Sequence, residues 1–99
     1  MFFVLREGVA VAVDRDTWIR EFAKTDRSIA VTEANNGRVS TVFLGLDHGF
    51  GTGKPVLFET MVFGGPLDGG CERYADMRGA IDGHARWVER VNGGADDGK

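Results

Sequence analysis

The sequence predicts an α+β fold in which an antiparallel β-meander of about four strands carries two helices packed on one face. Two long apolar runs, rich in β-branched and aromatic residues, flank a glycine-rich loop within Arg38–Gly64, which predicts a β-hairpin with a long tip. Asn36-Gly37 separates two further β-type runs and is typical of a tight turn, because both residues tolerate positive φ. One amphipathic stretch on each side of this region predicts a helix.

The N-terminal segment predicts a short β element followed by the first helix. Phe2–Leu5 and Val9–Val13 are apolar runs separated by a Glu-Gly pair, which indicates either a small hairpin or one strand with a connector. Asp14 or Asp16 is expected to cap a helix over about Arg15–Lys24, because a carboxylate accepts hydrogen bonds from the free amides of a first helical turn.

The meander is expected to follow the chain order. With Asn36-Gly37 as the turn, Val31 would lie opposite Val42 and Glu33 opposite Ser40. The four expected strands are Ser28–Ala34, Arg38–Leu46, Pro55–Phe63 and the short edge strand Cys71–Tyr74.

The second helix is expected over about Met77–Val91, with Asp76 as its cap. Gly79 and Gly83 each weaken such a helix by about 1 kcal/mol relative to alanine, so packing must hold it. Its predicted apolar face contains Met77, Ala80, Ile81, His84, Val88 and Val91.

Length and composition predict one α+β domain over residues 1–93, followed by a disordered tail over 94–99. The net charge of −3, from 15 acidic and 12 basic residues, supplies no basic field, so no nucleic-acid partner is expected. The apolar residues 1–13 lack the basic region of a signal peptide, and no run approaches the roughly 20 residues of a membrane helix. The one cysteine, Cys71, cannot form an internal disulfide. We therefore expect a cytoplasmic protein without a membrane partner.

Side chains alternate along a strand, so the meander has two faces. If Leu46 lies opposite Val56 across the long loop, one face is a core layer that contains Leu44 and Phe58. The other face is too apolar for a plain solvated surface, and it gathers Phe43, Leu57, Glu59, Met61 and Phe63. Residues 2–13 are expected to cover this second face, or the face is an exposed contact surface for a partner.

Three polar residues are candidates for chemistry. Asp47 and His48 adjoin the glycine-rich loop, where a histidine is suited to general base catalysis near neutral pH. Glu59 lies within an apolar strand, so its carboxylate is expected to be paired, hydrogen-bonded or solvent-facing. These three residues define a hypothetical enzyme or ligand site, and ordinary loop and strand roles are the simpler interpretation.

The sequence contains neither a phosphate-binding loop motif nor a metal-binding motif. The stretch Gly49–Lys54 does not match a phosphate loop, because His48 and Pro55 occupy the required Gly and Ser/Thr positions and a strand follows. No ligand-spaced pair such as H-E-x-x-H is present. A metal site would therefore need tertiary convergence of His48, Glu59, Glu72 and His84. We expect neither metal nor cofactor, and we interpret His84 as a hydrogen-bonded core histidine.

The segments RVSTVFLGLDHGFG, PVLFETMVFGG and ERYA, together with Gly83-His84, resemble a group of small proteins encoded by bacteriophages and prophages, notably of actinobacteria. The likeness covers about Thr17–Val91. It implies no particular activity, so no catalytic or binding residue is carried over. It does imply a phage-type cytosolic protein that binds host or phage proteins, including as an inhibitor of a bacterial defence system.

Three function hypotheses remain from the sequence. The leading one is a non-enzymatic protein that binds a host or phage protein, or a second copy of itself as a homodimer. The alternatives are a small enzyme or ligand-binding protein that uses Asp47, His48 and Glu59, and a structural homo-oligomeric accessory protein. Convergence of the polar residues in one cleft would favour chemistry, and a flat exposed apolar face would favour binding.

Overall fold

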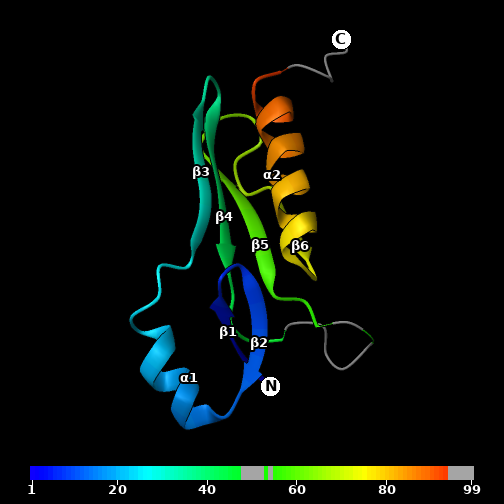
Figure 1. The fold of residues 1–99 in the computed structure, drawn as a ribbon. Coiled ribbons are helices and arrows are strands. Elements are labelled where there is room, and N and C mark those ends of the chain that lie inside the picture. Colours follow the sequence, from blue (N-terminus) through cyan, green and yellow to red (C-terminus); the bar gives the residue numbers. More distant parts are fainter. Residues whose placement is uncertain (48–52, 54, 94–99) are drawn as a thin grey trace.

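The computed structural model describes residues 1–47, 53 and 55–93 of the chain. The elements in order are β1 (Phe2–Arg6), β2 (Val9–Val13), α1 (Arg15–Phe22), β3 (Ser28–Ala34), β4 (Gly37–Phe43), β5 (Phe58–Phe63), β6 (Cys71–Tyr74) and α2 (Met77–Val91) (Figure 1). β1 pairs with β2, and β3-β4-β5-β6 form an antiparallel meander. The predicted α+β fold is confirmed. The predicted tail and most of the long loop lie outside the described residues.

The N-terminal segment is a true hairpin. Glu7 and Gly8 connect β1 to β2 with φ of 53° and 80°, and two positive φ values are what a two-residue type I′ turn requires. The alternative of one strand with a connector is therefore wrong. Asp14, and not Asp16, caps α1, because its Oδ1 accepts a hydrogen bond from the Thr17 amide at 2.8 Å.

The β3–β4 turn lies one residue earlier than the sequence predicts. Ala34 pairs with Gly37, so Asn35 and Asn36 form the turn. Gly37 instead lets the backbone of β4 lie close to the backbone of Gly64. Its φ is +143°, and a Cβ at this position would lie 2.7 Å from the Gly64 carbonyl oxygen. The expected cross-strand pairs are accordingly wrong by two residues, and Glu33 lies opposite Arg38.

The β4–β5 register also differs from the expectation, here by one residue. Phe43 pairs with Phe58, and Val39 pairs with Val62. This register brings the two phenylalanine rings together in a tilted arrangement, with a centroid distance of 5.3 Å, and leaves all four of these side chains at most 1% exposed. A one-residue slip moves a strand's side chains to the other face. Phe43 is therefore core, whereas Leu44, expected in the core, is only half-buried.

Both helices reach the same face of the meander. α2 lies along it (Figure 1), with Trp87 and Val91 packed on Val39 and Val62. Helix α1 packs mainly against β1, and its last residue, Phe22, contacts Phe43 at a ring centroid distance of 6.4 Å. No helix in the described part of the chain is long and apolar enough to cross a membrane.

The buried stripe of α2 differs slightly from the predicted one. Ile81, expected in the core, is 53% exposed, and Trp87 is buried instead. Gly83 explains part of this change in which side of α2 faces the sheet. A Cβ at this position would lie 2.2 Å from the Tyr74 hydroxyl oxygen, so only glycine lets this side of the helix lie so close to Tyr74. The glycine that weakens the isolated helix thus gives Tyr74 room to pack beneath it.

Candidate functional site

The sheet face that points away from α2 is the candidate site, and we call it the open face. Directly paired residues on neighbouring strands point to the same side, so the register assigns its members. None of them is buried, and Val31 and Phe63 are 54% and 49% exposed. The open face consists of Val31, Glu33, Arg38, Ser40, Val42, Glu59, Met61, Phe63, Cys71 and Arg73.

The sequence places part of this face correctly. Glu59, Met61 and Phe63 lie on it as expected. Phe43 and Leu57 do not contribute to an exposed surface, because they are 0% and 2% exposed and belong to the core. The assignment of Phe43 was wrong because it rested on the slipped β4–β5 register. Leu57 shares its alternation with Glu59, so its assignment failed for another reason: it precedes β5 and packs in the core cluster with Phe3. The missed members include Val31, Val42, Arg38 and Arg73.

Residues 2–13 do not cover the open face. The hairpin packs Phe3, with Leu5 and Ala10 beside it, against the core cluster that contains Phe43 and Phe58. That cluster lies on the α2 side of the sheet. The expectation that the N-terminal segment covers the second face is therefore wrong, and the face is unpartnered by that segment.

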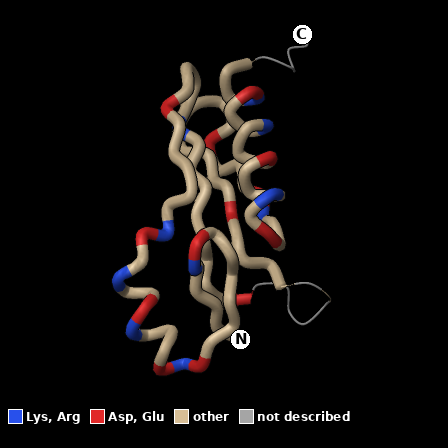
Figure 2. Tube along the Cα trace, in the orientation of Figure 1, with Lys and Arg blue, Asp and Glu red and all other residues tan. Residues whose placement is uncertain are grey.

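The charges on the open face form cross-strand ion pairs. Glu33 Oε2 lies 2.8 Å from Arg38 Nε, and Glu59 Oε2 lies 2.9 Å from Arg73 Nε. Each pair joins two residues that lie directly opposite in the sheet. Figure 2 shows charged residues concentrated on α1 and α2, while the strands carry few. The open face therefore combines apolar side chains, among them Val31, Met61 and Phe63, with paired charges.

The Cys71 thiol is part of the same face. Its Sγ donates to Glu59 Oε2 at 3.3 Å. Burial, followed by this hydrogen bond to a carboxylate, raises the pKa of Cys71. A raised pKa keeps the sulfur as a thiol near neutral pH, and only the thiolate is a good nucleophile. Cys71 thus lacks the properties of a reactive cysteine.

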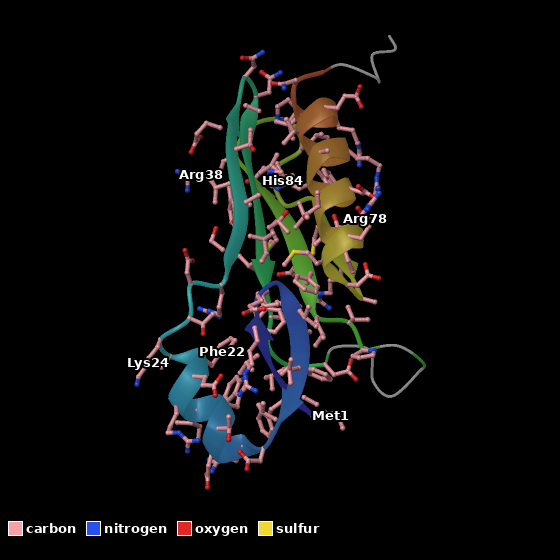
Figure 3. The ribbon with its side chains drawn as sticks, in the orientation of Figure 1. Met1, Phe22, Lys24, Arg38, Arg78 and His84 are labelled. Carbon is pink, nitrogen blue, oxygen red and sulfur yellow. The ribbon has the colours of Figure 1, made fainter. Side chains whose placement is uncertain are left out.

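One end of the open face is hollowed. A depression of about 460 Å³ is lined by Glu33, Ala34, Gly37, Arg38, Phe63 and Gly64. Two glycines contribute no side chain to it, while the Phe63 ring and the Arg38 guanidinium supply an apolar and a cationic wall. In Figure 3, Arg38 lies on the far side of the sheet from His84 and α2.

The covered face holds a buried polar network instead. His84 Nε2 lies 2.9 Å from Thr32 Oγ1, and its Nδ1 lies 2.8 Å from Thr41 Oγ1. Thr41 Oγ1 in turn lies 2.5 Å from Thr60 Oγ1. Burial lowers the pKa of His84. The expectation of a hydrogen-bonded core histidine is confirmed, and this network connects α2 to three neighbouring strands.

Glu72 connects β6 to α2 beside this network. Its Oε1 accepts hydrogen bonds from Tyr74 Oη at 3.0 Å, Trp87 Nε1 at 3.1 Å and Arg86 Nη2 at 3.3 Å. Burial acts to raise the pKa of Glu72, but the hydrogen bonds from Tyr74 and Trp87 and the Arg86 charge outweigh it and lower the pKa. These bonds give Glu72 a structural role in holding α2 on the sheet.

The structure describes two of the three candidate catalytic residues, Asp47 and Glu59, and gives each a different hydrogen-bond partner. Asp47 Oδ1 accepts a hydrogen bond from the Val56 amide at 2.9 Å, at the base of the long loop. His48 lies outside the described residues. Glu59 and His84 are on opposite faces of the sheet, so these two do not converge on one cleft. Among the described residues, no group of three or more His, Cys, Asp or Glu side chains is arranged to hold a metal ion.

Comparisons with known proteins do not place the chain in a family. No family model matches it, and neither the curated proteins nor the solved structures yielded a match. The resemblance to phage-encoded proteins therefore stays a prediction, and the functional argument depends on the geometry described above.

Proposed function

We propose that the protein is a non-enzymatic binding protein that recognises a partner protein through the open face. The observation that carries this proposal is a sheet face that no described segment covers, on which Val31 and Phe63 are about half exposed. Exposed apolar patches of this kind commonly mark interaction sites on soluble proteins. The ion-paired state of Glu59 and the raised pKa of Cys71 support binding over acid–base or nucleophilic chemistry at this face.

The size of the face favours a partner that extends beyond it. From ordinary strand spacing and rise, a four-stranded face of this length measures about 400 Å². Two copies packed face to face would bury about 800 Å² in total, below the roughly 1,000 Å² that a stable specific interface needs. We therefore favour a partner that reaches beyond this face over a second copy packed on the face alone.

The edge of the sheet supplies the additional contact. β3 is an edge strand of seven residues, so its outer backbone groups are available for pairing. A partner segment in extended conformation would add a strand beside β3 and place alternate side chains on the same side of the sheet as Val31. We assign the partner as a protein that offers such a segment.

The depression beside Phe63 and Arg38 indicates which kind of side chain the partner would place there. The Phe63 ring can stack with an aromatic ring, and the Arg38 guanidinium can lie over its face. Because Glu33 already neutralises Arg38, an added carboxylate would gain little there. An aromatic anchor residue therefore fits the hollow better than an acidic one.

The resemblance to phage-encoded proteins supplies the biological setting of this proposal. In that setting the protein acts in the cytoplasm of a bacterial host, and its partner is a host protein. Inhibition of a bacterial defence system is the corresponding role, since a small binding protein can block a larger assembly by occupying its interface.

The test compares two matched double variants in capture from a bacterial lysate, followed by titration with the purified captured protein. Val31→Lys with Phe63→Lys changes the open face, and Val9→Lys with Ile81→Lys changes two exposed apolar side chains elsewhere. We expect the open-face variant to bind at least about tenfold more weakly, a loss of roughly 1.4 kcal/mol, and the control to bind like the wild type.

Equal binding by both variants would refute the proposal. Sedimentation decides between partners: a wild-type dimer that the open-face variant converts to a monomer would assign the face to a second copy. Amide exchange on β3 tests the pairing, which should slow exchange there when the captured protein is bound.

A further inference from the structure

A second concave site reaches Phe58 on the covered face of the sheet and includes no open-face residue. It is a cavity of about 460 Å³ between the β1–β2 hairpin and the start of α2. Phe3, Leu57 and Phe58 line it and are at most 8% exposed, while Val9 at its rim is 61% exposed. The cavity therefore runs from solvent down to the aromatic core.

Small side chains on facing walls keep this space open. Gly8 and Ala10 line it from the hairpin, and Ala75 lines it from the segment before α2. A larger apolar residue at Ala10 or Ala75 would fill part of the space. The volume lies within the range of about 300–1,000 Å³ that small-molecule sites occupy in proteins.

The two charged residues that line the cavity, Asp76 and Arg78, are exposed to solvent, and each has a partner on α2. Asp76 Oδ1 accepts a hydrogen bond from the Gly79 amide at 2.8 Å, and Arg78 Nε lies 3.4 Å from Asp82 Oδ2. The buried walls of the cavity, Phe3, Leu57 and Phe58, offer no counter-charge, so a charged ligand that leaves water there incurs a desolvation cost. A neutral apolar ligand meets no such cost, and the Phe3 and Phe58 rings favour an aromatic one.

We propose that this cavity binds a neutral, ring-containing small molecule of about the size of indole or naphthalene. Its walls come from the hairpin and from α2, so a bound ring would contact both and hold them together. The site is independent of the proposed protein-binding function, because none of the open-face residues lines it.

The test titrates the full chain with indole and with naphthalene and follows amide chemical shifts. Saturable shifts are expected at Val9, Ala10, Ala75 and Met77. Ala75→Leu should weaken binding at least tenfold by filling the cavity. Ala10→Ile does the same from the other wall and serves as a second filling variant if the first does not fold. Ala85→Leu makes the same alanine-to-leucine change at an exposed position of α2 that does not line the cavity, and it should leave binding unchanged.

Three results would overturn the proposal. The first is no saturable shift in the folded wild type up to the solubility of either probe. The second is unchanged binding in a folded cavity-filling variant, or shifts that cluster on the open face. The third is equally tight binding of naphthalene-2-sulfonate, which would contradict the neutral ligand class.

Discussion

The two faces of the four-stranded sheet are built from the same strands but have different physical tasks. On the covered face, Val39, Thr41, Phe43, Thr60 and Val62 are all 0% exposed beneath α2. On the open face, no residue of the same strands is buried. The alternation of side chains along a strand does not by itself decide which of the two faces is covered. The difference shows that the covered face carries stability, while the open face is free to carry recognition.

The largest expected difference between the faces concerns two phenylalanines. Phe43→Ala should destabilise the fold by about 3–5 kcal/mol, because it leaves a cavity next to Phe58 in the core. Phe63→Ala should change stability by no more than about 0.5 kcal/mol, since its side chain is half exposed. Urea denaturation of both variants measures the contrast. Similar losses in the two variants would contradict the assignment of faces.

A second, smaller effect is expected at the contact between α2 and the covered face. Gly83→Ala should destabilise by about 1–3 kcal/mol through overpacking, although alanine is the better helix former by about 1 kcal/mol. The reason is the Tyr74 ring, whose hydroxyl oxygen would lie 2.2 Å from the new Cβ. Gly79→Ala is the matched control, because its nearest contact would be 3.2 Å. A Gly83→Ala protein as stable as the Gly79→Ala protein would show that α2 does not press on Tyr74.

The sequence predicted the elements better than their pairing, for a physical reason. Three predicted elements match the structure in both bounds, because composition and caps are local signals. They are the strands Ser28–Ala34 and Cys71–Tyr74 and the helix Met77–Val91. Register is not local, and the pairing of Phe43 with Phe58 depends on which side chains α2 can bury together. A slip of one residue was sufficient to misplace Phe43.

The members of the open face were predicted only in part for the same reason. Met61, Phe63 and Glu59 were placed correctly because β5 was assigned to the right face. Val31 was not recognised as part of the site, although the opposite charges of Glu33 and Arg38 on adjoining strands offered a usable signal. Placing those two charges opposite each other gives the observed β3–β4 register directly.

The smallest expected effect also separates the faces, and it concerns pH. His84 lies in the network on the covered face, and burial holds its pKa below the ordinary value of 6.5. Thr32 and Thr41 can each accept a hydrogen bond from an imidazolium, so protonation breaks no required bond. What remains is the cost of a charge in a buried site. The unfolded chain binds this proton more readily than the folded chain, so stability must decrease as the pH falls.

This contribution should be complete above about pH 6.5 and should be lost progressively as the pH falls through the lower pKa of His84 in the folded protein. Unfolding free energies of the wild type and of His84→Gln, measured between about pH 5 and 8, give the contribution by difference, because glutamine keeps polar groups but does not titrate in this range. Glu33→Gln on the open face is the control and should leave the wild-type profile unchanged, since its side chain is 70% exposed. Parallel profiles for the wild type and His84→Gln would mean that solvent reaches the histidine, and α2 would then not seal the covered face.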